Sequence, residues 1–286
     1  MIFMRKHEIA DHMYNLPRSI ENTFLFILAS LILMVSYDLF ASDFPIHHNP
    51  QSYVLTKFQS HDLILLGTRH KQPPILNFVS DLIKALHNSG VTHIGLEVES
   101  DQQGKIDHFI NTGEGLTDIS IHPQIDCPEY RNLFNVIRGL EPNQRPALVA
   151  VDLPKFKYGE NISRDEWIAK SIAGVFDTNP NAKMMVVVGN NHVLKKVDWQ
   201  DHVIDKHGSI RQYLSKKCGS TRFFSIGQVI GESIYEDDFW RAFGSIDGAV
   251  AVDLDGRFSG WKLGIMQSVA INPGEVWELL DGLVVY

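Results

Sequence analysis

Short apolar runs alternate with longer amphipathic segments along most of the chain. Runs of four to six residues rich in Leu, Ile and Val, without polar alternation, are typical of strands buried on both faces. Such strands belong to mostly parallel sheets that are covered by helices. The sequence predicts strands at residues 62–66, 93–97, 147–151, 184–188 and 222–226, with further strands at 249–253 and 283–286.

Helical periodicity fills the stretches between these runs. Residues 75–86 carry apolar side chains three and four positions apart, directly after Pro73-Pro74, and Pro is tolerated in the first turn of a helix. Further helices are predicted over 129–140, 209–217 and from Ser163, whose spacing to Glu166 is that of a capping box. This alternation predicts an α/β fold of three layers, with a mostly parallel central sheet flanked by helices.

The N-terminal part has a different composition. Residues 23–36 are uninterruptedly apolar, shorter than the roughly 20 residues of a bilayer span but suited to the core of a signal peptide. Small residues around Ala41 offer a cleavage point. We expect residues 1–41 to be a signal peptide or an N-terminal membrane anchor, and the protein to be periplasmic, secreted or anchored through residues 23–37. A buried core helix is a third interpretation. Polar residues 42–60 are predicted as a linker, and residues 61–286 as a single α/β domain.

One motif occurs twice, each time directly after a predicted strand. Gly67 is followed by His70, and Gly189 is followed by His192, both with two residues between. Gly lets the chain leave a strand sharply, and ligands of open parallel sheets bind outside the carboxyl ends of the strands. Glu97 ends another predicted strand, so we expect both histidines and this glutamate to meet there. The alternative is that each histidine caps a loop or faces solvent.

Two histidines and a carboxylate suit hydrolysis in two ways. They are a common ligand set for a catalytic divalent ion with an open position, which lowers the pKa of its bound water to about 7. Alternatively one histidine is the general base, since its ordinary pKa of about 6.5 suits neutral pH. Glu97 would then orient that histidine or hold the water.

Other polar residues follow the same strands. Arg69 and Arg164 are candidates for binding an anionic substrate group or an oxyanion, although Arg164 could equally form a charge pair at the start of its helix. Asn191 could donate to an oxyanion or merely form a turn. Asp152 ends the third predicted strand, where a substrate contact and a turn are both open.

Composition excludes some partners. The formal net charge is −8, the pI is about 5.9, and no basic patch stands out, so nucleic acid is not expected as a partner. Cys127 and Cys218 are the only cysteines and form no Cys-x-x-Cys pattern, so neither a zinc motif nor a thiol nucleophile is indicated.

Four sequence stretches in order resemble a known superfamily. Residues 65–70 (LLGTRH), 95–97 (GLE), 163–169 (SRDEWIA) and 188–192 (VGNNH) resemble the proteins that unite erythromycin esterase-like, ChaN haem-binding and Tiki/TraB members. The closing residues 280–286 (LDGLVVY) are similar to the end of esterase-like members. The resemblance covers about residue 60 to the C-terminus and implies an α/β fold with a cleft at the strand ends.

The branches of this superfamily imply different chemistry. In Tiki-like members the matching residues, here His70, Glu97 and His192, bind a divalent metal such as Mn, Co or Zn for peptide hydrolysis. Esterase-like members use the His and Glu to open lactones without an obligatory metal, and ChaN binds haem. Thr68 is closer to the Tiki/TraB form, whereas Arg164-Asp165 matches the other two branches. The resemblance implies a hydrolase of a small-molecule or peptide substrate, which the N-terminal block predicts to be exported, or alternatively a non-enzymatic haem- or iron-binding protein.

Overall fold

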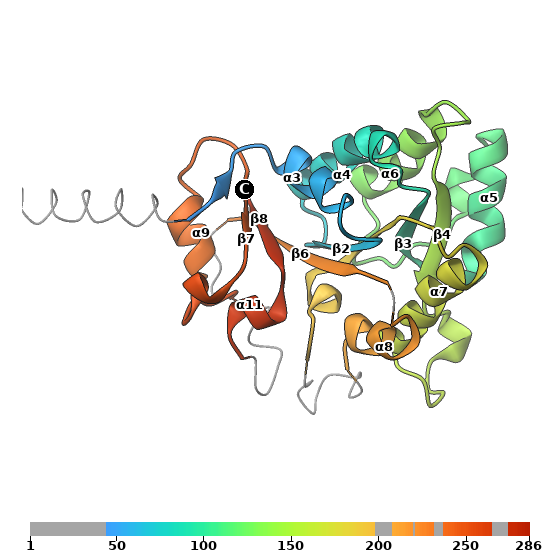
Figure 1. Cartoon of the computed structure of the whole chain (residues 1–286). Coiled ribbons are helices and arrows are strands. Elements are labelled where there is room, and N and C mark those ends of the chain that lie inside the picture. The colour runs from blue at the N-terminus through green and yellow to red at the C-terminus, as the bar shows by residue number, and fades with distance from the viewer. Residues whose placement is uncertain (1–43, 198–207, 220, 232–236, 265–273) are drawn as a thin grey trace, which may run out of the picture. The chain divides into compact units, whose positions relative to one another are not determined.

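Eight strands form one mixed sheet in the order β1-β7-β8-β6-β2-β5-β3-β4 (Figure 1). The computed structural model describes residues 44–197, 208–219, 221–231, 237–264 and 274–286. The strands are β1 Ile46–His47, β2 Leu63–Thr68, β3 His93–Glu99, β4 Ala147–Asp152, β5 Met184–Gly189, β6 Phe223–Val229, β7 Val250–Asp253 and β8 Gly282–Val285. Each predicted strand is therefore present, with ends that differ by at most three residues.

Helices connect the strands. They are α3 Pro50–Lys57, α4 Pro73–Ala85, α5 Gln103–Thr112, α6 Pro128–Gly139, α7 Arg164–Thr178, α8 Ile210–Lys217, α9 Asp238–Phe243 and α11 Val276–Leu279. Short 3-10 turns complete them at η1 Leu86–Ser89, η2 Ser100–Gln102, η3 Leu116–Asp118, η4 Lys155–Lys157, η5 Asn190–Val193 and η6 Gly256–Phe258. Ser163 caps α7 as predicted, because its side chain accepts a hydrogen bond from Glu166 N at 3.0 Å. The Glu166 side chain instead pairs with Lys170.

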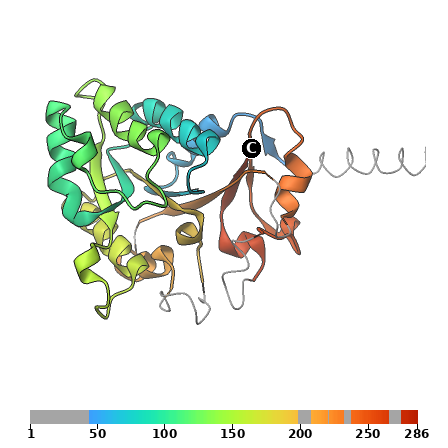
Figure 2. The same cartoon turned by 180° about the vertical axis from the view of Figure 1, so that it is seen from behind.

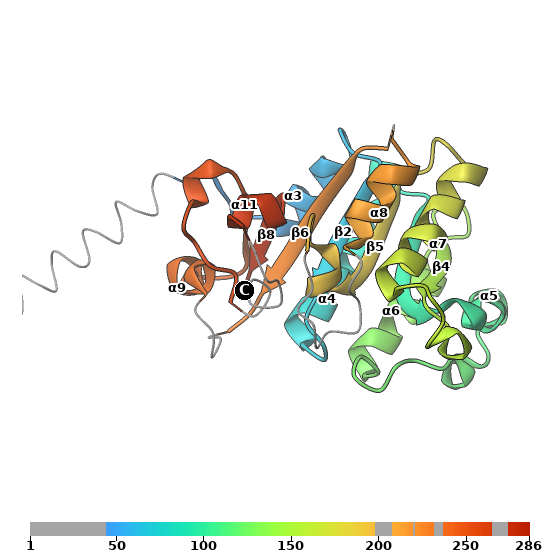
Figure 3. The same ribbon diagram turned by 90° about the horizontal axis from the view of Figure 1, so that it is seen from below.

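The sheet is mostly parallel and covered on both faces, which confirms the predicted fold class. The six strands from β8 to β4 in the sheet order are parallel, and β1 and β7 form antiparallel pairs at one edge. One apolar cluster joins α3, α4 and α6 to Ile64, Leu66, Ile94 and Leu96. Helices α7 and α8 cover the other face, as Figures 2 and 3 show from behind and from below.

The linker predicted over residues 42–60 is wrong. Ile46–His47 forms β1 and Pro50–Lys57 forms α3, so the α/β unit begins at Ile46 rather than at residue 61. Tyr53, Val54 and Phe58 are buried against the sheet, and Tyr53 Oη donates a hydrogen bond to Asp253 Oδ1 at 2.8 Å. The prediction failed because this segment is mostly polar, and only a few apolar residues pack it against the core.

The apolar block at residues 23–36 lies outside the described residues, so export stays a prediction. Within the described part of the chain, no helix is both long and apolar enough to span a bilayer. Cys127 and Cys218 are both free thiols.

The edge strand β4 is partly covered by a side chain. Gln103, the first residue of α5, donates from Nε2 to the Leu148 carbonyl at 2.9 Å. Its Oε1 accepts a hydrogen bond from Ala150 N at 2.8 Å. The amide thus pairs with the strand as a neighbouring strand would.

Strands β2 and β6 separate near their carboxyl ends. Their pairing extends only to Leu66 opposite Ile226. Beyond this pair, the side-chain amide of Asn190 forms the hydrogen bonds to β6. Its Nδ2 donates to the Gln228 carbonyl at 2.7 Å, and its Oδ1 accepts from Gln228 N at 3.0 Å. Gly67 provides the space, because a Cβ there would lie 2.2 Å from Asn190 Oδ1.

We expect Gly67→Ala to destabilise the fold by about 1–3 kcal/mol, since the methyl group must displace Asn190. Urea unfolding monitored by circular dichroism measures the change. Gly174→Ala is the matched control, because Gly174 lies within α7 and a Cβ added there would meet nothing within 4 Å. It should stabilise the protein by about 0.5–1 kcal/mol through helix propensity. Equal effects of the two substitutions would contradict this account of Gly67.

Candidate active site

A cavity of about 360 Å³ opens at the carboxyl ends of β2, β5 and β6. Both Gly-x-x-His motifs contribute to it, as does the end of β6. The described residues that line it are Thr68, Arg69, His70, Gly189, Asn190, Asn191, His192, Gln228, Val229, Ile230, Gly231, Asp237 and Leu263. The two copies of the motif therefore meet at one place.

Gly189 lies at the centre of the predicted constellation. A Cβ at this position would lie 3.5 Å from His70 Nε2, 3.5 Å from His192 Cδ2 and 3.8 Å from Glu97 Oε2. The structure thus brings together the two histidines and the glutamate that the sequence places after three different strands. A side chain at Gly189 would occupy the space that these three groups share.

Glu97 is a buried carboxylate with both oxygens occupied. Its Oε2 accepts a hydrogen bond from Gly189 N at 2.7 Å, and its Oε1 accepts one from Arg164 Nη2 at 2.6 Å. Burial alone would raise the pKa of Glu97, but the Arg164 guanidinium holds it below its ordinary value. Glu97 therefore carries a negative charge at neutral pH.

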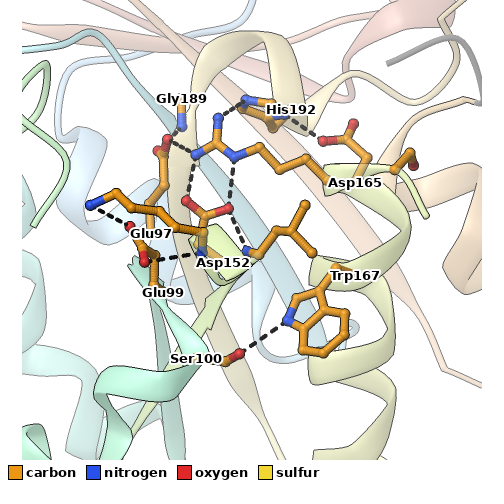
Figure 4. A network of polar contacts seen from close by, with 12 residues as sticks. Glu97, Glu99, Ser100, Asp152, Asp165, Trp167, Gly189 and His192 are labelled. Carbon is orange, nitrogen blue, oxygen red and sulfur yellow. Dashed lines mark hydrogen bonds and ion pairs between the residues drawn. The ribbon is translucent and has the colours of Figure 1, made fainter. Parts of the chain in front are cut away.

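The Arg164 guanidinium is the cation that connects these groups, and Figure 4 labels its partners Glu97, Asp152 and His192. Arg164 is the first residue of α7, and its Nε and Nη2 donate to the two oxygens of Asp152, each at 2.7 Å. The same Nη2 donates to Glu97, and Nη1 lies 3.1 Å from His192 Nε2. Asp152 ends β4 and does not line the cavity, so the structure places it as an anchor for Arg164.

His192 is held at both ring nitrogens. Nδ1 lies 2.5 Å from Oδ1 of Asp165, which is fully buried. Arg164 can only donate, so its hydrogen bond to Nε2 requires a neutral ring with the proton on Nδ1, directed at Asp165. Burial lowers the pKa of His192, but the Asp165 and Glu97 carboxylates together outweigh this effect and raise it. Neither nitrogen is therefore available to a substrate while this arrangement persists.

His70 is in the opposite situation. It follows β2 in an exposed turn and makes no hydrogen bond to any other described residue. Partial burial lowers the pKa of His70, the Glu97 carboxylate opposes this effect, and the Arg164 cation lowers the pKa further. Its imidazole is therefore neutral at pH 7 and can accept a proton.

The remaining predicted residues divide between the cavity and its surroundings. Arg69 lines the cavity, and its Nη1 donates to the Ile230 carbonyl at 3.1 Å. Asn191 also lines it, and its side chain makes no hydrogen bond to another described residue. Glu99, a further carboxylate near the site, is paired instead with Lys155 at 3.2 Å.

Asp165 and Asp237 are site residues that sequence reasoning misses. Asp165 stands next to Arg164 at a helix start, and nothing in that position points to a histidine 27 residues later. Asp237 lies beside the aromatic segment 239–243, whose composition indicates only a cover for the sheet. It lines the same cavity as Val229 at the end of β6.

His70, Glu97 and His192 do not fit a divalent metal in this arrangement. The described residues contain no group of three or more His, Cys, Asp or Glu side chains placed to hold an ion. Both nitrogens of His192 and both oxygens of Glu97 are hydrogen-bonded, and the Arg164 guanidinium contacts both residues. A cation is already present where the metal would have to bind.

Comparison with known proteins shows the fold. No protein-family model and no curated protein sequence matches the chain. A mutant of the erythromycin esterase EreC in its open conformation has a TM-score of 0.60 and 13% identity, over 82% of this chain and 92% of that one. A Bacillus cereus protein gives 0.53 and 14%, over 80% and 89%. ChaN of Campylobacter jejuni with cofacial haem gives 0.48 and 11%, over 85% and 96%. The chain has the α/β fold of erythromycin esterase.

We expect Arg164→Met to destabilise the protein by about 3 kcal/mol or more, because it leaves the buried Glu97 and Asp152 carboxylates without their cation. Urea unfolding at pH 7 provides the measurement. Lys84→Met, which removes a cation from an exposed pair with Asp81, is the control and should change stability by less than about 0.5 kcal/mol. A similarly small effect of Arg164→Met would show that the network does not hold the site together.

Proposed function

We propose that this protein is a hydrolase of carboxylic esters or lactones, with His70 as the general base. The observation that carries the proposal is the neutral, unbonded imidazole of His70 beside the ionised Glu97, at a cavity that also holds free donors. The cavity volume of about 360 Å³ is that of a small-molecule site. The erythromycin esterase fold agrees with this reaction class.

His70 starts the reaction by taking a proton from a water molecule on Nε2. The hydroxide adds to the carbonyl carbon of the ester, and the tetrahedral intermediate collapses with loss of the alcohol. The proton on His70 passes to the departing oxygen, so the ring returns to its neutral state. Glu97 stabilises the transient imidazolium, since its negative charge raises the pKa of His70.

The developing oxyanion needs hydrogen-bond donors. Asn191 offers an uncommitted side-chain amide in the cavity, and Arg69 offers its remaining guanidinium N–H groups. Arg164 does not line the cavity, so we assign it as a positioning residue that fixes Glu97 and His192. Asp152 and Asp165 hold Arg164 and His192 in turn.

Export belongs to the same proposal. The apolar residues 23–36 would direct the protein out of the cytoplasm or hold it at the membrane, where it would meet small-molecule substrates from outside the cell.

We expect His70→Ala to reduce kcat for p-nitrophenyl ester hydrolysis by about 100-fold or more, as for loss of a general base. The preparation should span residues 42–286. His87→Ala, an exposed histidine on η1, should retain wild-type activity. Circular dichroism of each variant checks that the fold is intact. Full activity of a folded His70→Ala variant would refute this role.

The same preparation tests haem binding. His70 is the histidine that would hold a haem iron, since both nitrogens of His192 are bonded. Haemin is added to wild type and to His70→Ala. A stoichiometric Soret shift that needs His70, without esterase activity, would favour a haem-binding protein over a hydrolase.

The pH profile gives a separate prediction. His70 must be deprotonated to act as a base, so kcat/KM rises with pH through the pKa of this residue. Because the pKa of His70 is lowered, the midpoint of this limb should lie below the ordinary value of about 6.5. Stopped-flow assays with a neutral ester from pH 4.5 to 8.5 measure it. A midpoint above 6.5 would contradict the environment described for His70.

A further inference from the structure

The cavity wall includes a carboxylate, Asp237, that does not belong to the His70, Glu97 and His192 constellation. Asp237 lines the cavity together with Val229, Ile230 and Leu263, three apolar residues. Asp237 pairs with Leu263 through an isolated β-bridge and caps the first turn of α9, where its Oδ1 accepts a hydrogen bond from Trp240 N at 3.0 Å. The carboxylate therefore has a fixed position in an apolar part of the wall.

Asp237 has no cationic partner in the described part of the chain. Its exposed fraction is 6%, yet no lysine, arginine or histidine there forms an ion pair with it. Arg241, one turn along α9, pairs instead with Asp238 at 3.3 Å. Arg69 lines the same cavity without pairing with Asp237. The neighbouring segments 232–236 and 265–273 contain no Lys, Arg or His in their sequences.

A buried carboxylate without a cation is unusual. Charged residues are almost never fully buried unless they are paired, because the loss of hydration is costly. Burial accordingly raises the pKa of Asp237, and its capping hydrogen bonds offset only part of this effect. An ion pair with a ligand would reduce this penalty, and Asp237 lines the cavity in which a ligand would bind.

We propose that Asp237 is a specificity residue that binds a positively charged amine of the substrate. The proposal rests on the hydrolase function above and specifies its substrate class. The substrate is an ester or lactone with an apolar body and a basic nitrogen. Val229, Ile230 and Leu263 contact the body, the ammonium group pairs with Asp237, and the carbonyl group lies at His70.

Arg69, which also lines the cavity, would favour a negatively charged substrate. A preference for an anionic ester is therefore the competing outcome of the test. The Arg69 side chain is exposed at the rim, where solvent screens its field, and one of its nitrogens is already bonded to the Ile230 carbonyl. Asp237 is buried and fixed by its helix cap, so its field acts over the cavity with less screening. We therefore expect the buried carboxylate of Asp237, rather than Arg69, to determine which substrate charge is preferred.

Three p-nitrophenyl esters of matched shape test the proposal at pH 8. They are the ester of 4-(trimethylammonio)butyrate, which is cationic, its neutral carbon isostere 5,5-dimethylhexanoate, and the anionic monoester of glutarate. In the wild type, kcat/KM for the cationic ester should exceed that for the neutral one by about ten-fold or more. Asp237→Asn keeps the shape and the helix cap, and it should bring the ratio close to one.

Asp238→Asn is the matched control. Asp238 is the next residue, pairs with Arg241 and does not line the cavity, so this variant should keep the wild-type ratio. Equal turnover of the cationic and neutral esters by the wild type would overturn the proposal. So would a preference for the glutarate ester, or loss of the ratio in Asp238→Asn as well.

Binding measured without turnover separates this proposal from the hydrolase function. Calorimetric titration of wild type, His70→Ala and Asp237→Asn uses the stable amides of 4-(trimethylammonio)butyrate and 5,5-dimethylhexanoate. Preferential binding of the cationic amide to the first two proteins but not to Asp237→Asn would support the cation subsite even if no ester were hydrolysed. Hydrolysis without any such preference would uphold the hydrolase and overturn the subsite.

Discussion

The geometry of the site depends on the ion pairs of Arg164. This one guanidinium contacts carboxylates from the ends of β3 and β4 and a histidine that follows β5. Glu97 and Asp152 are almost fully buried, and buried carboxylates side by side would repel each other without a cation. Because Arg164 begins α7, the packing of that helix on the sheet fixes the relative positions of three strand ends. The geometry of the polar site therefore depends on the packing of the apolar core.

The two Gly-x-x-His motifs are alike in sequence and different in chemistry. His192 is enclosed by Asp165 and Arg164, which fix its tautomer and occupy both nitrogens. His70 has neither partner, although a Cβ at Gly189 would lie 3.5 Å from an atom of either ring. The environment of each ring, rather than the motif, therefore distinguishes the two histidines. In the proposed mechanism the ring without a hydrogen-bond partner is the base.

The strands can be predicted well from the sequence because their apolar runs are long and uniform, and buried parallel strands leave that signature. The pattern also places His70, Glu97 and His192 at one edge of the sheet, since strand ends share an edge. It does not reveal Asp165 as the partner of His192, because this contact depends on how α7 meets η5. Helix α3 resembles a linker, since its few buried side chains are separated by polar residues. Asp237 lines the cavity together with residues from distant parts of the chain, and no sequence pattern indicates this.

The Gln103 amide on β4 has a consequence for assembly. An edge strand with open N–H and C=O groups is a template on which a strand from another molecule can add. Gln103 fills that position between Leu148 and Ala150, so a foreign strand would first have to displace an intramolecular pair of hydrogen bonds. Asp152 lies at the end of this same strand. A foreign strand paired with β4 could displace Asp152 and with it Arg164. By occupying the edge of β4, Gln103 therefore opposes both intermolecular strand pairing and this disturbance of the site.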